Sequence, residues 1–348
     1  MTDKMKAALW DGKGLLEVRE VDKPLIGPKD ALVKVKSSGI CGSDLLIYAD
    51  KNEAETLPQG HEIAGEVVDV GVDVDKQIIG TRVAIEGIGH GKACLNCYYC
   101  NAGQYFLCED IGIERGGGYA EYVVTKAQGL YPIANSMNWD EAGLVEPYAV
   151  ALHAIRRGEL SGGETVAVLG SGTIGLCTIA AARAMGAGHI IATARYPQQD
   201  SMARMMGADM VVTSEGDVLN EALLDYSNGT GSDLTIETVG GRSDAVITQA
   251  VDVTRKQGRI VTTGNFYTPI QFDWMKAILK EHSVIWSATY ATTNGRNEFQ
   301  IAIEQMGSKL VDLNPLVTHR FPLSEIQKGL DTSFDKNGGA IKVQIQSD

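Results

Sequence analysis

The chain has 348 residues and a formal charge of −13, with 44% hydrophobic and 22% charged residues. These proportions are ordinary for a globular protein, and the length suffices for two domains that each bury a core. The acidic balance excludes nucleic acid as a main partner, because a phosphate backbone requires a basic face.

No apolar signal core occurs in the first residues, MTDKMKAALWDG, and no run of 18 apolar residues occurs anywhere. We therefore expect a cytoplasmic protein that does not bind a membrane. The forty glycines are an excess, and they cluster in short motifs. This clustering indicates turns and close approach of the backbone to a ligand.

The N-terminal part is predicted to be rich in β-strands, at residues 5–10, 14–20, 31–40, 64–71 and 81–87. Cys41 follows the third of these strands, and His61 and Glu62 precede the fourth. A thiolate, an imidazole and a carboxylate together suit zinc better than magnesium or calcium. Ser43 could place its hydroxyl on a metal-bound substrate. Alone, the three candidate ligands are a weak signal, because such residues are more often structural.

Four cysteines with the spacing C-x2-C-x2-C-x7-C give the strongest spacing signal: Cys94, Cys97, Cys100 and Cys108. Four thiolates in a compact loop form a closed tetrahedral zinc site, whose role is structural. An iron–sulfur cluster is the alternative, since it also takes four thiolates. Disulfides are disfavoured in a reducing compartment.

A turn and a strand are predicted for 116–124, and a helix for 144–158. Glu146 precedes a proline at the start of this helix, where a carboxylate is favoured electrostatically. The simplest role for Glu146 is to stabilise the start of the helix. The simplest role for His153 is to pack as an ordinary helical side chain.

From residue 165 the pattern alternates between strands and helices. Strands are predicted at 165–170, 189–194, 209–213, 233–238, 258–264 and 282–289, with helices at 176–187 and 198–208. This alternation predicts an α/β domain with a doubly wound parallel sheet.

The first strand of this domain runs into GSGTIG, residues 170–175, which leads into a helix. A G-x-G-x-x-G sequence is informative between a strand and a helix. Gly170 permits the tight turn, Gly172 lets the backbone approach a pyrophosphate, and Gly175 lets the helix pack closely. Thr173 and Ile174 lie in the same turn, and the amides at the start of the following helix would face the phosphates.

The second strand ends in Thr193, Ala194, Arg195 and Tyr196, without the acidic residue that binds the ribose hydroxyls of NAD. A guanidinium can bind a 2′-phosphate through two donors and stack on adenine. We therefore predict a cofactor site at Ala194, Arg195 and Tyr196 with a preference for NADP(H).

The tail is predicted to form a helix at 297–307 and a strand at 340–346 that returns to the N-terminal domain. The expected division is a catalytic domain at 1–153 with the cysteine loop at 94–108, a dinucleotide-binding domain at 154–290, and a return to the catalytic domain at 291–348.

On these residues the chain resembles the zinc-dependent medium-chain alcohol dehydrogenases, and within them the sorbitol, butanediol and threonine dehydrogenase branch. The resemblance covers nearly the whole chain and rests on GICGSD (39–44), GHEIAGEV (60–67), the cysteine loop, GGGYAEY (116–122), VEPYAVALHA (145–154) and GSGTIG. It implies a GroES-like catalytic domain beside a Rossmann domain.

The resemblance also implies a catalytic zinc at Cys41 and His61, with Glu62 or Glu146 as a further or alternating ligand. It implies a structural zinc at the four cysteines, and assembly into a homodimer or homotetramer. Ser43 would pass the substrate proton, with Glu62 and Glu146 as acidic groups beside the metal.

Two positions depart from the family. A proton-relaying histidine is common five residues after the catalytic cysteine, but Leu46 stands there. Water near Glu62 or Glu146 would then carry the proton. Residues 285–290 lack the arginine of polyol-oxidising members. Family position would place Ser43, Tyr48, Ile113, Arg115 and Tyr290 near the substrate.

The expected function is the NADP(H)-preferring interconversion of a secondary alcohol, such as a polyol, a diol or a hydroxy-substituted small molecule, and its ketone. The alternatives are a zinc-independent quinone or enoyl reductase of the same superfamily, and a non-catalytic NADPH-binding protein.

Overall fold

The computed structural model describes residues 3–50, 53–112, 117–214 and 217–347, without the side chains at positions 46, 47, 49 and 50. Its internal contacts divide the chain into two compact units. Unit 1 comprises Met1–Glu146 and Tyr290–Asp348, and unit 2 comprises Pro147–Thr289. Within the described ranges, no helix combines the length and the apolar composition needed to cross a bilayer.

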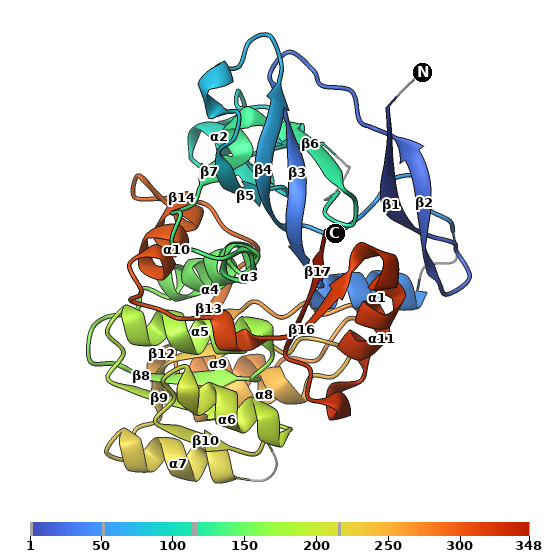
Figure 1. The fold of residues 1–348 in the computed structure, drawn as a ribbon. Coiled ribbons are helices and arrows are strands. Elements are labelled where there is room, and N and C mark those ends of the chain that lie inside the picture. Colours follow the sequence, from blue (N-terminus) through green and yellow to red (C-terminus); the bar gives the residue numbers. More distant parts are fainter. Residues whose placement is uncertain (1–2, 51–52, 113–116, 215–216, 348) are drawn as a thin grey trace. The chain divides into compact units, whose positions relative to one another are not determined.

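Unit 1 is built on a seven-stranded sheet in the order β16-β17-β3-β4-β5-β7, with β6 paired to β3 (Figure 1). Its strands are β3 (Asp30–Gly39), β4 (Glu62–Val70), β5 (Arg82–Glu86), β6 (Tyr122–Lys126), β7 (Leu130–Pro132), β16 (Val317–Pro322) and β17 (Lys342–Gln346). A hairpin of β1 (Lys4–Trp10) and β2 (Leu16–Asp22) forms a separate sheet. β17 is antiparallel to β3, so the C-terminal strand lies within the sheet of the N-terminal region.

Alternation of apolar residues in β3, β4 and β5 builds one core of this unit, because every second side chain of a strand points to the same face. This core contains Ala31, Val33, Val35, Ile63, Val67, Val83, Ile85 and Val123. A second core joins β17 to two helices and contains Trp10, Ile40, Leu45, Tyr48, Tyr119, Leu330 and Ile345 among others. Both cores lie next to the strand ends that carry Cys41 and His61.

The α-helices of unit 1 are α1 (Gly42–Asp50), α2 (Tyr98–Asn101), α3 (Trp139–Ala142), α10 (Glu298–Gly307) and α11 (Ile326–Phe334). The short strands β14 (Thr292–Thr293) and β15 (Arg296–Asn297) pair with each other. Helix α4 (Val145–Arg157) begins in unit 1 and continues into unit 2.

Unit 2 contains a six-stranded parallel sheet in the order β10-β9-β8-β11-β12-β13. The strands are β8 (Thr165–Leu169), β9 (His189–Thr193), β10 (Met210–Val212), β11 (Ser232–Glu237), β12 (Thr254–Thr262) and β13 (Ser283–Trp286). The helices are α5 (Thr173–Ala184), α6 (Pro197–Met205), α7 (Val218–Tyr226), α8 (Ala245–Val253) and α9 (Trp274–Leu279). Counted along the chain, the strand order is 3-2-1-4-5-6, which confirms the predicted doubly wound parallel sheet.

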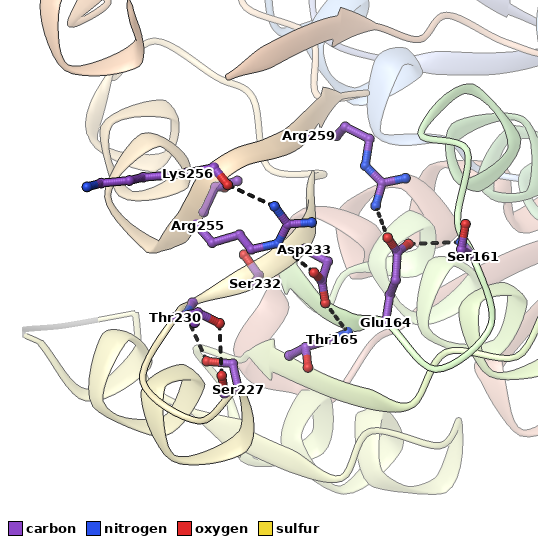
Figure 2. Close-up of polar contacts among 12 residues, drawn as sticks. Ser161, Glu164, Thr165, Ser227, Thr230, Ser232, Asp233, Arg255, Lys256 and Arg259 are labelled. Atoms are coloured by element: carbon purple, nitrogen blue, oxygen red, sulfur yellow. Dashed lines mark hydrogen bonds and ion pairs between the residues drawn. The ribbon is translucent and has the colours of Figure 1, made fainter. Parts of the chain in front are cut away.

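Ion pairs join the amino ends of the central strands of unit 2 (Figure 2). Asp233 accepts hydrogen bonds from Arg255 Nε at 2.6 Å and from the backbone nitrogen of Thr165 at 2.8 Å. Arg259 pairs with Glu164, just before β8. These contacts fix β8, β11 and β12 at the end of the sheet opposite to the glycine-rich turn.

Candidate functional site

Cys41, His61 and Glu62 come together because β3 and β4 are antiparallel neighbours, with Gly39 opposite Glu62. Their ligand atoms all lie within 4.8 Å of one another. A thiolate, an imidazole and a carboxylate at this spacing form a donor set that fits zinc. The residues present therefore fit the metal that the sequence predicts.

Asp44, in the first turn of α1, orients the candidate ligands. Its Oδ1 lies 3.6 Å from His61 Nδ1, and its Oδ2 accepts a hydrogen bond of 3.0 Å from the backbone nitrogen of Cys41. Burial alone would lower the pKa of His61, but the nearby Asp44 and Cys41 raise it well above its ordinary value. A carboxylate behind a ligating histidine fixes the ring and increases its basicity.

Tyr119 supports Asp44 from the loop before β6. Its hydroxyl donates a hydrogen bond of 2.6 Å to Asp44 Oδ2, and the side chain is buried. Gly60 has a φ of +87°, and a Cβ there would lie 2.7 Å from the Tyr119 ring. Glycine at position 60 thus permits both the backbone turn before His61 and the packing of Tyr119.

Glu62 forms a buried ion pair with Lys342 of β17. Lys342 Nζ lies 2.7 Å from each carboxylate oxygen, and the side chains of Lys342 and Glu62 are 2% and 1% exposed. A buried carboxylate requires such compensation, because an isolated buried charge is strongly unfavourable.

Glu146 lies in the first turn of α4 and is buried. It is not among the described residues whose ligand atoms gather at Cys41 and His61. Burial raises the pKa of Glu146 to about 7, with His61 opposing the rise and Glu62 adding to it. Glu146 therefore lies within electrostatic range of the candidate metal centre, beyond its role at the helix start.

The segment before Glu146 is held by β17. Gln344 donates to the backbone oxygen of Asp140 at 2.9 Å and accepts from Ser37 Oγ at 3.0 Å. Gln346 donates to Asp140 Oδ1 at 2.7 Å. Alternate residues of the C-terminal strand therefore fix the part of the chain that leads to Glu146.

The remaining predicted substrate-side residues are only partly described. Ser43 is half-buried in the first turn of α1, and Tyr48 and Tyr290 are buried. Ile113, Arg115 and the side chain of Leu46 lie outside the described residues.

The four cysteines lie close together, with all four sulfur atoms within 4.8 Å of one another. Backbone amides point at the sulfurs: the nitrogen of Cys94 lies 3.2 Å from Cys108 Sγ. Hydrogen bonds from backbone amides lower the pKa of Cys97 to about 6, which favours a thiolate. Lys126 of β6 donates to the backbone oxygen of Ala93 at 2.7 Å and anchors the loop. The arrangement fits a tetrahedral metal site.

In unit 2 the glycine-rich turn connects β8 to α5. Gly170 has a φ of +96°, and Gly172 is the N-cap of α5. A Cβ on Gly175 would lie 1.8 Å from the backbone oxygen of Gly170, so only glycine allows this close packing. Thr193 Oγ1 accepts a hydrogen bond of 2.8 Å from the nitrogen of Gly170 and ties the turn to β9. Thr173 and Ile174 begin α5, and the amides at the start of a helix suit a pyrophosphate.

Arg195 follows β9 and is exposed. Its guanidinium carbon lies 5.8 Å from the centre of the Tyr196 ring. Gln199 accepts from the backbone nitrogens of Arg195 and Tyr196, at 3.1 and 3.3 Å. The backbone after Ala194 is thereby fixed, while the Arg195 side chain has no ion pair among the described residues.

Sequence reasoning missed Asp44, Tyr119 and Lys342, which all contact a candidate ligand or the residue behind it. A signal existed for Asp44, which stands three residues after Cys41 in the motif GICGSD. No local pattern pointed to Lys342, since 280 positions separate it from Glu62.

Comparison with known proteins covers both units. Residues 27–135 match the family model described as alcohol dehydrogenase GroES-like domain, and residues 173–308 match the model described as zinc-binding dehydrogenase. Sorbitol dehydrogenase from Bacillus subtilis (strain 168) is 30% identical over 351 residues, covering 98% of this chain and 97% of that protein.

Two solved structures are similar over nearly the whole chain and differ in their cofactor. A zinc-binding dehydrogenase from Sinorhizobium meliloti 1021, bound to NADP, has a TM-score of 0.84 at 28% identity and covers 99% of this chain and 100% of its own. An alcohol dehydrogenase from Escherichia coli CFT073, in complex with NADH, has a TM-score of 0.88 at 26% identity and covers 99% of each chain.

Proposed function

The chain belongs to the zinc-dependent medium-chain alcohol dehydrogenases, and on that premise we propose that it interconverts a secondary alcohol and its ketone with a preference for NADP(H). Alcohol dehydrogenase activity follows from the family. The metal ligands, the preferred cofactor and the substrate class are the parts that we propose.

The observation that carries the proposal is the cluster of Cys41, His61 and Glu62, with Asp44 behind His61. Three metal-binding side chains of different chemistry, oriented by a buried carboxylate, are the arrangement of a catalytic zinc site. A metal-free reductase would not require them. The four-cysteine loop has only thiolate ligands and would hold a second, structural zinc.

When bound, zinc lowers the pKa of the alcohol hydroxyl, and NADP⁺ accepts the hydride from the alcohol carbon. The residues of this chain orient the reactants and move the proton. Ser43 would accept the proton that the alcohol hydroxyl loses and would pass its own hydroxyl proton onward. Asp44 holds His61 in one orientation throughout.

Glu146 is the residue that we propose to take the proton onward, since the histidine of many relatives is replaced by Leu46. Burial raises the pKa of Glu146, which favours its taking up a proton. Glu62 is less suited, because both of its oxygens already accept hydrogen bonds from Lys342.

The cofactor preference rests on Arg195 and on the missing carboxylate at the end of β9. The amides at the start of α5 would bind the pyrophosphate, and Arg195 would bind the 2′-phosphate. The relatives include one structure with NADP and one with NADH, so the family alone does not decide the preference.

Assembly into a homodimer or homotetramer belongs to the same proposal. Strand β13 is the last strand of its sheet, and large apolar side chains are exposed on it and on α9: Trp274, Met275, Ile278, Leu279 and Trp286. Exposed apolar side chains beside a sheet edge are typical of a contact surface. We also propose a cytoplasmic location, which the clustered thiols favour.

Metal analysis and a substrate screen test this function. We expect about two zinc ions per chain, and reduction of NADP⁺ with a secondary alcohol, a diol, a polyol or a hydroxy acid, followed at the nicotinamide absorbance. Cys41→Ala should lose one zinc and about 10³-fold in kcat. A metal-free protein that reduces quinones or enoyl compounds, or a protein that binds NADPH without turnover, would contradict the proposal.

A further inference from the structure

A series of polar side chains runs from the last residue of β5 to the loop that follows it. Glu86 is buried, and Tyr131 of the neighbouring strand β7 donates a hydrogen bond to its carboxylate. Nδ1 of His90 lies 2.9 Å from the Tyr131 hydroxyl. His90 is only half-buried, so these three side chains connect the interior of unit 1 with its surface.

Tyr290 extends the series in the other direction. Its side chain is buried, and the amide of Ile88, in the loop between Glu86 and His90, donates to its oxygen. Burial, together with the charges of Glu146 and Glu86, raises the pKa of Tyr290 well above its ordinary value, so the phenol keeps its proton. No acceptor for that proton is fixed among the described residues. Together four side chains form the Glu86 network: Tyr290, Glu86, Tyr131 and His90.

Glu86 is placed to bind and release a proton. Its carboxylate accepts from the His90 amide at 3.0 Å and from Nδ2 of Asn297 at 3.5 Å. Burial raises the pKa of Glu86 to about 7, and the charge of the buried Glu298 adds to the rise. A carboxyl group whose pKa lies near the working pH exchanges protons efficiently. The other titratable groups that act on Glu86 or are acted on by it are Tyr131 and Tyr290.

We propose that the alcohol proton, once it is on Glu146, reaches solvent through the Glu86 network. This route rests on the proposed function, in which Glu146 takes the proton onward. It supplies the exit that a relay histidine gives in many relatives, at the position where this chain has Leu46. The members of the network do not touch the substrate, and they act through Glu146.

Each step of the route moves one proton between neighbouring groups. Glu146 gives its proton to the Tyr290 oxygen, while Tyr290 gives its own hydroxyl proton to Glu86. Protonated Glu86 then donates its proton to the Tyr131 oxygen, and the Tyr131 hydroxyl proton passes to Nδ1 of His90. Nε2 of His90 releases a proton to water, and the ring exchanges protons with solvent before the next turnover. Both carboxylates and both phenols end in their starting states.

Solvent isotope effects on alcohol oxidation by the zinc-loaded full-length protein test this route. The probe is the alcohol oxidised fastest in the substrate screen, with isopropanol and sorbitol as the first trials. Tyr131→Phe keeps the ring but removes the hydroxyl between Glu86 and His90. We expect kcat to fall about tenfold or more, with little change in KM, because a proton-transfer group is lost. The ratio of kcat in ordinary water to kcat in heavy water should increase, since proton release becomes the slow step.

Two further variants separate this role from a structural one. His90→Gln keeps a polar group beside Tyr131 but cannot carry a proton, so it should show the same changes as Tyr131→Phe. Combining the two should cause no further loss, because one break already blocks the route. Tyr122→Phe, on β6 and outside the network, should match the wild type. A merely structural role would lower Tm or zinc content without raising the solvent isotope effect, and that result would overturn the inference.

The route and the proposed function fail in different ways. If the wild-type protein oxidises an alcohol, but Tyr131→Phe and His90→Gln keep its kcat and its solvent isotope effect, only the route is wrong. If the wild-type protein oxidises no alcohol of the screen, the proposed function is wrong, and the route is wrong with it.

Discussion

The hydroxyl of Tyr119 donates a hydrogen bond of 2.6 Å to Asp44, and Asp44 in turn lies 3.6 Å from Nδ1 of His61. All of these contacts lie within unit 1. A candidate zinc ligand is therefore oriented by a buried tyrosine that has no direct contact with the metal position. Burial raises the pKa of Tyr119 well above its ordinary value, so the phenol remains a hydrogen-bond donor.

This relationship predicts graded losses of zinc affinity. Asp44→Asn should weaken zinc binding about 10- to 100-fold, because the negative charge behind His61 is lost. Tyr119→Phe should have a smaller effect, about tenfold, since it removes one hydrogen bond to a charged group. Competition with a chelator measures both. Tyr122→Phe is the control, because its ring contacts Lys23 without needing the hydroxyl. Equal affinities for the Tyr119 and Tyr122 variants would contradict the prediction.

Unfolding stability should depend on pH through Glu86, which is fully buried. Burial raises its pKa from 4.5 to about 7, against hydrogen bonds from the His90 amide, Tyr131 and Asn297. The folded protein then keeps a proton that the unfolded chain releases, so stability falls as pH rises from about 4.5 to 7. The full effect is about 3 kcal/mol and is constant above that range.

Glu86→Gln should remove this decline. Burial lowers the pKa of His90 to about 4, so the unfolded chain takes up a proton that the folded chain does not. That group makes stability rise with pH between about 4 and 6.5, the opposite sign. Urea unfolding from pH 5 to 8 measures the free energy of unfolding. The value for Glu86→Gln should increase relative to that of the wild type as pH rises. Glu20→Gln, at an exposed position, should follow the wild type.

Cofactor preference should depend on the side chain of Arg195. Arg195→Ala should lower kcat/KM with NADP⁺ about 10- to 100-fold, which is the loss expected for charge-assisted hydrogen bonds to a phosphate. The same variant should leave kcat/KM with NAD⁺ nearly unchanged. Arg204→Ala is the control, because Arg204 lies on the following helix and pairs with Asp200. A wild-type protein that uses NAD⁺ at least as well as NADP⁺ would show the assignment to be wrong.

The four-cysteine loop should hold zinc for stability rather than for chemistry. Cys97→Ser should reduce the zinc content by about one ion per chain and lower Tm by about 5 °C or more, since the loop would lose its internal constraint. Cys177→Ala, in α5 and outside both clusters, should leave the zinc content unchanged. Visible absorbance with iron in the purified protein would instead favour an iron–sulfur cluster.

Local residue spacing was enough to predict the elements whose pattern repeats within a few residues. Alternating apolar residues located β3, β4 and β5, and the turn between β8 and α5 followed from Gly170, Gly172 and Gly175. The helices α7, α8 and α9 were not predicted, although α8 is amphipathic in the structure, with Ile247, Ala250 and Val251 buried. These helices span only 9, 9 and 6 residues, so each offers few turns over which a helical period can be recognised.

The sequence by itself determined the donor types of the candidate metal centre, because Cys41, His61 and Glu62 lie in two short motifs next to strands. Only the tertiary structure decided what surrounds them. Lys342 reaches Glu62 across 280 residues because β17 pairs with β3 and β3 pairs with β4. The register of paired strands decides which distant side chains meet, and since a shift of one residue turns each side chain to the opposite face, no local pattern could specify these contacts.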